Sequence, residues 1–186
     1  MLKPADVTHL MSGRKIARIA FQPEEIERRV QELGREIGAA YPTGELLVLG
    51  LLKGSFVFVA DLVREVPRPL QVDFLVASSY GAEKVSSGNV RLVYDPETRL
   101  EGKHILLVED IIDSGRTLNR LLEVLAERKP KSVEICALLD KGLADGVLRK
   151  KPKFLGFKAP NEFLVGYGLD HAEDFRHLPF VASLAE

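Results

Sequence analysis

The chain has 186 residues, about the length of one ordinary domain, so we expect a single domain over residues 1–186. Hydrophobic residues make up 46% and charged residues 28%, which is typical of a globular protein and excludes a disordered one. The 26 basic residues are balanced by 27 acidic ones, and this disfavours nucleic acid as the main partner.

The start of the chain and its cysteine content exclude further classes. Met1–Arg18 holds an acid, a histidine and several basic residues without a continuous apolar stretch, so it resembles neither a signal peptide nor a membrane anchor. No later run is apolar over the ~18 residues that a spanning helix needs, and we expect a cytoplasmic protein. The one cysteine, Cys136, excludes an internal disulfide, and its apolar surroundings predict a buried thiol.

Helices and strands alternate along the first two thirds of the chain. Pro23 suits the first turn of a helix, and apolar residues then recur at helical spacing until the cluster Tyr41–Gly44 ends it. Ser78–Asn89 is polar and rich in Ser and Gly, which predicts a mobile flap. The remaining strands are expected at Leu46–Leu52, Leu70–Ala77, Val90–Tyr94, His104–Val108 and Ser132–Leu139, with helices at Ser55–Val66 and Arg116–Arg128.

This alternation predicts an α/β fold with a parallel sheet and a ligand site at the carboxyl ends of its strands. The last third, Gly142–Glu186, breaks the rhythm and holds glycines, prolines and aromatics in short pieces such as Phe154–Phe157 and Phe163–Tyr167. We expect this part to form a small cap, or hood, over the open edge of the sheet, together with the N-terminal segment.

The most informative stretch is His104–Leu118, with the sequence HILLVEDIIDSGRTL. An apolar strand leads to Glu109 and Asp110, and the polar run Asp113–Thr117 then opens a helix. Unpaired backbone N–H groups at a helix start favour a phosphate, and a glycine allows the chain to approach it closely. Two acids just ahead of that site suit the neighbouring hydroxyls of a sugar or a magnesium ion.

The segment resembles the phosphoribosyl-pyrophosphate motif of type I phosphoribosyltransferases, and its sequence is close to that of the hypoxanthine-guanine branch. The resemblance implies the type I phosphoribosyltransferase fold. It also implies that Glu109 and Asp110 hold the ribose hydroxyls and help to hold Mg²⁺. The residues implied to hold the 5′-phosphate are Asp113, Ser114, Gly115, Arg116 and Thr117.

Asp113 is the candidate catalytic residue. An acid inside a phosphate loop is electrostatically unfavourable, so its carboxylate must point elsewhere or have a task of its own. In the family that it resembles, the matching acid faces the purine N7 as general base or acid. This role makes chemical sense, because bond formation at N9 requires that a purine proton be removed.

Other positions extend the resemblance to the leaving group. Leu52-Lys53-Gly54 is similar to the family's pyrophosphate-binding turn, where the resemblance implies a cis peptide between Leu52 and Lys53. Ser79 and Tyr80 match the start of the catalytic flap, which would close over the pyrophosphate and exclude water. Arg176 resembles a further pyrophosphate contact.

Three positions would recognise the base. A cation at Lys141 would donate to O6 of hypoxanthine or guanine and is mismatched to the amino group of adenine. Phe163 matches the aromatic that stacks on the base, and the backbone of Leu164 would contact the purine edge. Asp170 resembles the family's second Mg²⁺ ligand, whereas His171 and the other histidines fall in no metal-ligand pattern.

The expected function is the salvage of hypoxanthine or guanine with phosphoribosyl pyrophosphate, giving IMP or GMP. Three alternatives stay open: a transferase for another base, xanthine above all; a transcriptional regulator that keeps the fold without catalysis; and a generic nucleotide-binding protein. The family forms homodimers and homotetramers, and the resemblance implies one of these.

Overall fold

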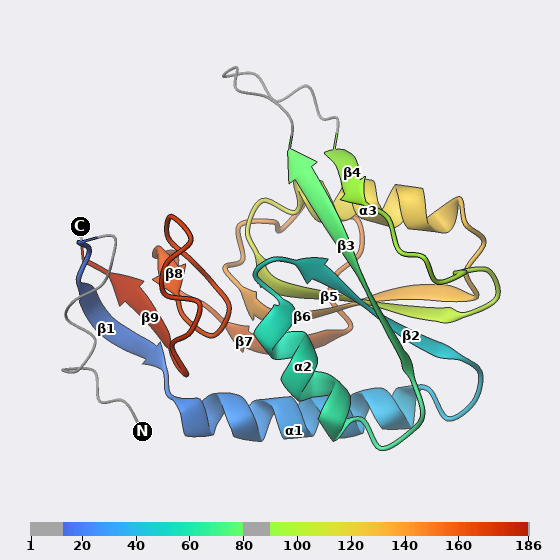
Figure 1. The fold of residues 1–186 in the computed structure, drawn as a ribbon, viewed down its shortest axis with the longest axis horizontal. Helices are drawn as coiled ribbons and strands as arrows, with labels where there is room; N and C mark the ends of the chain where they lie inside the picture. Colours follow the sequence, from blue (N-terminus) through green and yellow to red (C-terminus); the bar gives the residue numbers. More distant parts are fainter. Residues whose placement is uncertain (1–12, 80–89, 186) are drawn as a thin grey trace.

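A computed structural model describes residues 13–79 and 90–185 and contains two sheets (Figure 1). The main sheet has six strands in the order β4-β3-β2-β5-β6-β7, all parallel except β4, which runs antiparallel to β3. Its strands are β2 (Leu46–Leu52), β3 (Gln71–Ser79), β4 (Val90–Tyr94), β5 (His104–Ile112), β6 (Ser132–Asp140) and β7 (Phe154–Lys158).

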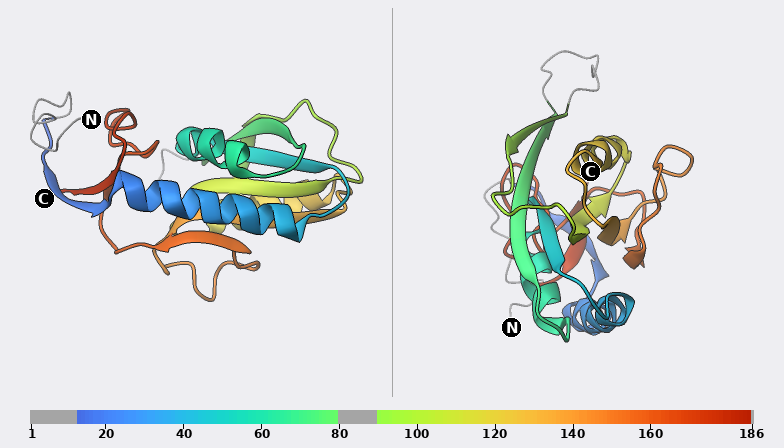
Figure 2. Two further views of the ribbon diagram at one scale, coloured as in Figure 1. Left: turned by 90° about the horizontal axis from the view of Figure 1, so that it is seen from below. Right: turned by 90° about the vertical axis from the view of Figure 1, so that its right-hand side faces the viewer.

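Helices cover both faces of the main sheet, as Figures 1 and 2 show. The helices α1 (Pro23–Ala40) and α2 (Phe56–Glu65) pack on one face, and α3 (Arg116–Ala126) packs on the other. The helices α1 and α2 approach so closely that a Cβ on Gly34 would overlap the backbone of Glu65. The parallel α/β fold predicted from the alternation is therefore confirmed.

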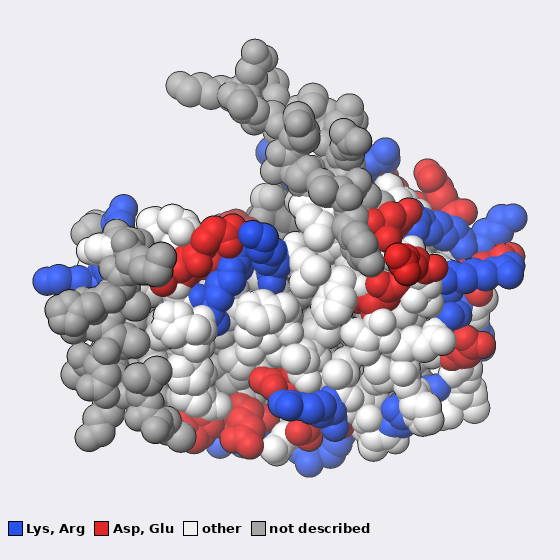
Figure 3. Space-filling view, viewed as in Figure 1, with Lys and Arg blue, Asp and Glu red and all other residues white. Residues whose placement is uncertain are grey.

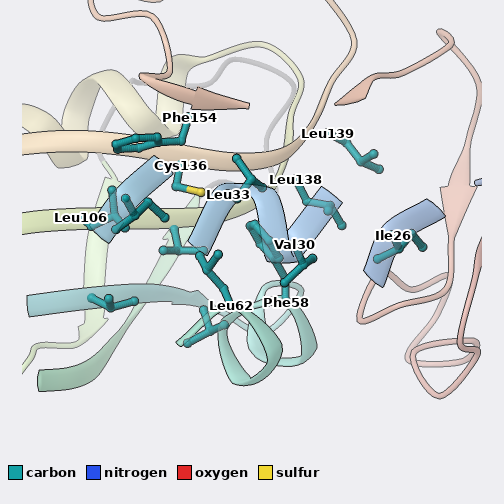
Figure 4. Packing of buried hydrophobic residues seen from close by; sticks show 14 of the residues in the cluster. Ile26, Val30, Leu33, Phe58, Leu62, Leu106, Cys136, Leu138, Leu139 and Phe154 are labelled. Carbon is teal, nitrogen blue, oxygen red and sulfur yellow. The ribbon is translucent and has the colours of Figure 1, made fainter. Parts of the chain in front are cut away.

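Successive residues of the strands point into different halves of the core, as a pleated strand requires. Leu106 and Val108 of β5 pack with α1 and α2, whereas Ile105 and Leu107 pack with α3. Cys136 lies in the first of these clusters, fully buried among the side chains drawn in Figure 4. Burial raises the pKa of its thiol, and the prediction of a buried cysteine is confirmed.

The small sheet has the order β1-β9-β8, with β1 (Ile16–Phe21), β8 (Leu164–Val165) and β9 (Val181–Leu184). It joins the two ends of the chain, because β1 pairs with β9 (Figure 1). This sheet has its own buried cluster, made of Val165, Phe175, Leu178, Phe180 and Ala182. We call β1, β8, β9 and the turns between β8 and β9 the hood.

Two expectations were wrong in detail. The strand expected to end at Val108 continues to Ile112, because β6 pairs with it as far as Asp140, so Glu109 and Asp110 lie within β5. The segment Phe154–Phe157, assigned to the cap, lies in the edge strand β7 of the main sheet. Within the described ranges, no helix has the length and apolarity needed to cross a membrane.

Candidate active site

The predicted phosphate loop, residues 113–117, runs from the end of β5 into the first turn of α3. Gly115 caps the helix with a φ of +70°, a left-handed conformation that favours glycine. A Cβ there would also lie only 3.0 Å from Ala144 and 3.2 Å from Leu148. The loop encloses a hollow of about 130 Å³, lined by Glu109, Ile111, Ile112, Asp113, Ser114, Gly115, Thr117 and Leu118.

Glu109 and Asp110 are consecutive residues of β5, and Glu109 lines this hollow. Burial, and then the charge of Asp110, raise the pKa of Glu109 well above its ordinary value. Burial also raises the pKa of Asp110, although hydrogen bonds and the charge of Arg176 oppose this shift. The Oε2 atom of Glu109 is buried and makes no hydrogen bond within the described part of the chain. An incoming sugar hydroxyl would satisfy it.

The turn after β2 lies between Asp110 and the hood. A Cβ on Gly54 would overlap the carboxylate of Asp110, and a Cβ on Gly168 would overlap the backbone oxygen of Gly54. Three segments that are distant in sequence therefore meet where only glycines fit. The peptide between Leu52 and Lys53 is cis, as the resemblance implied.

The two cations predicted to bind pyrophosphate come together at this turn. Arg176 donates to the carbonyl of Gly168 over 2.8 Å and forms an ion pair with Asp170, also at 2.8 Å. Both Lys53 and Arg176 contact the carboxylate of Glu173, at 3.0 Å and 3.2 Å. Glu173 was not among the residues predicted from the sequence. Its position between Asp170 and Arg176, two predicted site residues, is the feature of the sequence that could have indicated it.

Two of the residues predicted to bind the base, Lys141 and Phe163, line a second hollow of about 450 Å³. Its lining includes Lys141, Phe163 and His171, together with Arg14, Asn161, Glu162, Leu184 and Ala185. Phe163 is 56% exposed, and its ring meets the ring of His171 edge-on with 5.3 Å between the centroids. His171, which falls in no metal-ligand pattern of the sequence, thus forms part of this wall.

Lys141 links this hollow to the phosphate loop. Its side chain is 12% exposed, and its Nζ lies 3.8 Å from the Oδ2 of Asp113. The backbone N–H of Lys141 donates to the carbonyl of Ile112, which places the end of β6 beside the end of β5. Leu164 is buried in β8, next to Phe163.

Part of the predicted flap lies outside the described residues. Ser79 is the last residue of β3, and Tyr80 belongs to the segment that the structure does not describe. On the described part of the face in Figure 3, acidic and basic side chains alternate instead of forming a basic stripe.

These features define the class of the protein. A phosphate loop, two acids and a turn with two cations meet at the carboxyl ends of a parallel sheet, which is the place and the chemistry of a sugar-phosphate site in an α/β protein. Residues 21–172 match the phosphoribosyl transferase domain model. The chain belongs to the phosphoribosyltransferase family, and the predicted family and fold class are confirmed.

Known proteins are similar over nearly the whole chain. The hypoxanthine phosphoribosyltransferase of Salmonella typhimurium is 48% identical over 162 residues, which are 86% of this chain and 90% of that protein. The hypoxanthine-guanine phosphoribosyltransferase of Bacillus subtilis is 44% identical over 94% of this chain and 96% of its own length. A crystal structure of a hypoxanthine-guanine phosphoribosyltransferase from Bacillus anthracis aligns with a TM-score of 0.86 and 39% identity, covering 93% and 99% of the two chains.

Proposed function

We propose that the chain transfers the phosphoribosyl group of phosphoribosyl pyrophosphate to N9 of hypoxanthine or guanine, forming IMP or GMP in purine salvage. The observation that carries this proposal is the approach of Lys141 to Asp113, between the phosphate loop and the hollow beside Phe163. This approach supports a pair in which Lys141 donates to O6 and Asp113 handles the N7 proton along one edge of the same base. Relatives named for these bases support the substrate class.

Different residues bind the different parts of phosphoribosyl pyrophosphate. The loop Asp113–Thr117 binds the 5′-phosphate through N–H groups at the start of α3 and the hydroxyls of Ser114 and Thr117. Glu109 and Asp110 accept hydrogen bonds from the ribose hydroxyls. Lys53 and Arg176 bind the pyrophosphate, and their positive charges stabilise it as it leaves C1′.

Asp113 acts at the base. As N9 attacks C1′ and pyrophosphate leaves, positive charge passes to the purine, and the Asp113 carboxylate accepts the proton from N7. Phe163 stacks on the ring, Lys141 donates to O6 and the backbone at Leu164 contacts the far edge. Ser79 and Tyr80, at the start of the proposed flap, exclude water from the reacting carbon.

Magnesium fits the acids of this site. Mg²⁺ usually keeps several waters and binds through one or two carboxylates together with substrate phosphates. In the described part of the chain, no three acidic, histidine or cysteine side chains gather into a ready-made cage. The buried, unpaired oxygen of Glu109 and the carboxylate of Asp170 fit a metal that arrives with the polyphosphate. We propose Glu109, Asp110 and Asp170 as the residues that hold it, where its charge would stabilise the leaving group.

The first test is a panel of bases. The purified protein is incubated with phosphoribosyl pyrophosphate, magnesium and hypoxanthine, guanine, xanthine, adenine or uracil, and nucleotide formation is followed by absorbance. Turnover of hypoxanthine or guanine is expected. Turnover of adenine or uracil alone would refute the base site, and no turnover despite tight binding of phosphoribosyl pyrophosphate would favour the regulator.

The second test concerns Asp113. Asp113→Asn keeps the shape of the loop but cannot accept the N7 proton, so kcat is expected to fall by about 10²–10⁴-fold while phosphoribosyl pyrophosphate still binds. Near-normal turnover by this variant would remove Asp113 from the mechanism. The cytoplasmic location and a homodimer or homotetramer are also proposed, and light scattering of the purified protein measures the oligomer.

A further inference from the structure

Glu173 forms a bridge between two cations that come from different parts of the fold. Its Oε1 lies 3.0 Å from Nζ of Lys53, which follows β2, and its Oε2 lies 3.2 Å from a guanidinium nitrogen of Arg176 in the hood. One carboxylate thus contacts both of the groups to which the pyrophosphate binding is assigned. A carboxylate and a phosphate oxygen offer these donors the same kind of acceptor.

We propose that Glu173 is an internal substitute for the pyrophosphate group: it occupies Lys53 and Arg176 in the empty enzyme, is displaced when phosphoribosyl pyrophosphate binds, and returns as pyrophosphate leaves. The proposal rests on the proposed function of Lys53 and Arg176. It adds a residue that competes with the substrate for its own site and so sets the affinity for phosphoribosyl pyrophosphate and the release of the product.

Hydrogen bonds hold the backbone around Glu173, and they fix the position from which its side chain extends. His171 and Asp174 exchange backbone hydrogen bonds of 3.2 Å and 3.1 Å across a tight turn. Glu173 has a φ of +65° inside this turn, and its N–H donates to Asp170 over 2.9 Å. Asp170 is in turn held by Arg176. The turn therefore keeps the carboxylate within reach of both cations.

The side chain itself is free to leave. The side chains of Glu173 and Lys53 are 64% and 65% exposed, and such exposed ion pairs are weak. Arg176 is only 19% exposed and is anchored to the carbonyl of Gly168 and to Asp170, so it stays in place when Glu173 moves. The contact is strong enough to fill the site and weak enough for a polyanion to displace it.

Electrostatics make the exchange necessary. The hydrogen bond from Lys53, and then that from Arg176, lower the pKa of Glu173, so the side chain is negatively charged at neutral pH. Together with Asp170, it balances the charges of Lys53 and Arg176 in the empty site. Once pyrophosphate is bound, the same charge lies beside a multiply charged anion and repels it. Removal of the charge should therefore strengthen pyrophosphate binding.

The experiment compares Glu173→Gln with the wild type by calorimetry, with magnesium pyrophosphate and magnesium phosphoribosyl pyrophosphate as separate probes. Both probes are expected to bind about three- to tenfold more tightly to the variant. The KM for phosphoribosyl pyrophosphate should fall, inhibition by pyrophosphate should strengthen by the same factor, and the KM for hypoxanthine should stay unchanged.

Two further variants serve as controls. Glu123 also bridges two cations, Arg120 and Arg149, but lies on α3 away from the turn, so Glu123→Gln should leave every affinity unchanged. Glu173→Asp keeps the charge on a shorter side chain that cannot span both cations, and its affinities should lie between those of the wild type and Glu173→Gln.

The outcomes separate the proposal from the function on which it rests. If the wild type binds neither probe, the pyrophosphate site is wrong, and the role of Glu173 is refuted with it. If the wild type binds both but Glu173→Gln binds equally or more weakly, the site stands. In that case Glu173 only braces Arg176, and the substitute role is refuted.

Discussion

The substitution Gly54→Ala tests whether the turn after β2 fixes Asp110, one of the two acids proposed to bind the ribose. The added methyl would overlap the carboxylate of Asp110, while the close contact with Gly168 prevents the turn from retreating. Asp110 must then swing away from its place in β5. The φ of Gly54 is not positive, so alanine introduces no left-handed strain and the clash alone drives the change.

The size of the effect follows from the bond that Asp110 would lose. A hydrogen bond to a charged group contributes about 1.5–3 kcal/mol, so kcat/KM for phosphoribosyl pyrophosphate is expected to fall by about 10- to 150-fold. Steady-state kinetics with saturating hypoxanthine measures this ratio. The free energy of unfolding, from urea titration, reports any overpacking, which costs about 1–3 kcal/mol.

Gly102→Ala is the matched control, since Gly102 has a φ of +77° and no atom within 4 Å of the added methyl. It should lower stability by about 1–2 kcal/mol through backbone strain and leave kcat/KM unchanged. A Gly54→Ala enzyme with normal kcat/KM would refute the reasoning, because Asp110 would then tolerate displacement or play no part in binding.

Two further predictions concern charged groups of the site. Lys141→Gln removes the cation proposed to donate to O6, so kcat/KM for hypoxanthine should fall by about 10- to 150-fold, while calorimetry should find unchanged binding of phosphoribosyl pyrophosphate. The pKa of Glu109 is raised in the folded, ligand-free protein. Above the ordinary glutamate pKa of 4.5 the unfolded chain therefore loses a proton that the folded protein still holds on Glu109. Stability should therefore fall as pH rises from 4.5 through the raised pKa, and urea titrations should find this slope flattened in Glu109→Gln.

The main sheet was predictable because its signals are local. Apolar runs such as Leu46–Leu52 are buried on both faces and stand out from their polar neighbours. The phosphate loop was predictable for a related reason, since the helix start, Gly115 and the acids ahead of it are consecutive in sequence. The turn at Lys53 and the lysine after β6 follow strands that the same patterns located.

The hood could not be predicted in detail, because its contacts join distant segments. Strand β1 forms by pairing with β9 at the other end of the chain, and the sequence of Ile16–Phe21 does not indicate which strand it pairs with. The roles of His171 and Glu173 depend on a turn with positive φ at Ala172 and Glu173, where neither residue is a glycine. Such a turn carries no clear sequence signal. The extension of β5 to Ile112 likewise depends on the length of β6.

The small sheet is tied to the main core through its own strands. Val165 and Ala182 point into the cluster of the hood, whereas their neighbours Leu164 and Val181 pack in the cluster beneath α1 and α2. Because successive side chains of β8 and β9 point to opposite faces, these two strands pack against both cores and hold the two sheets together. The hood supplies Asp170 and Arg176, Phe163 directly precedes it, and the loops that follow strands of the main sheet supply Lys53, Lys141 and residues 113–117. Buried packing therefore fixes the hood against the main sheet, and with it the spacing between the proposed base-binding and pyrophosphate-binding residues.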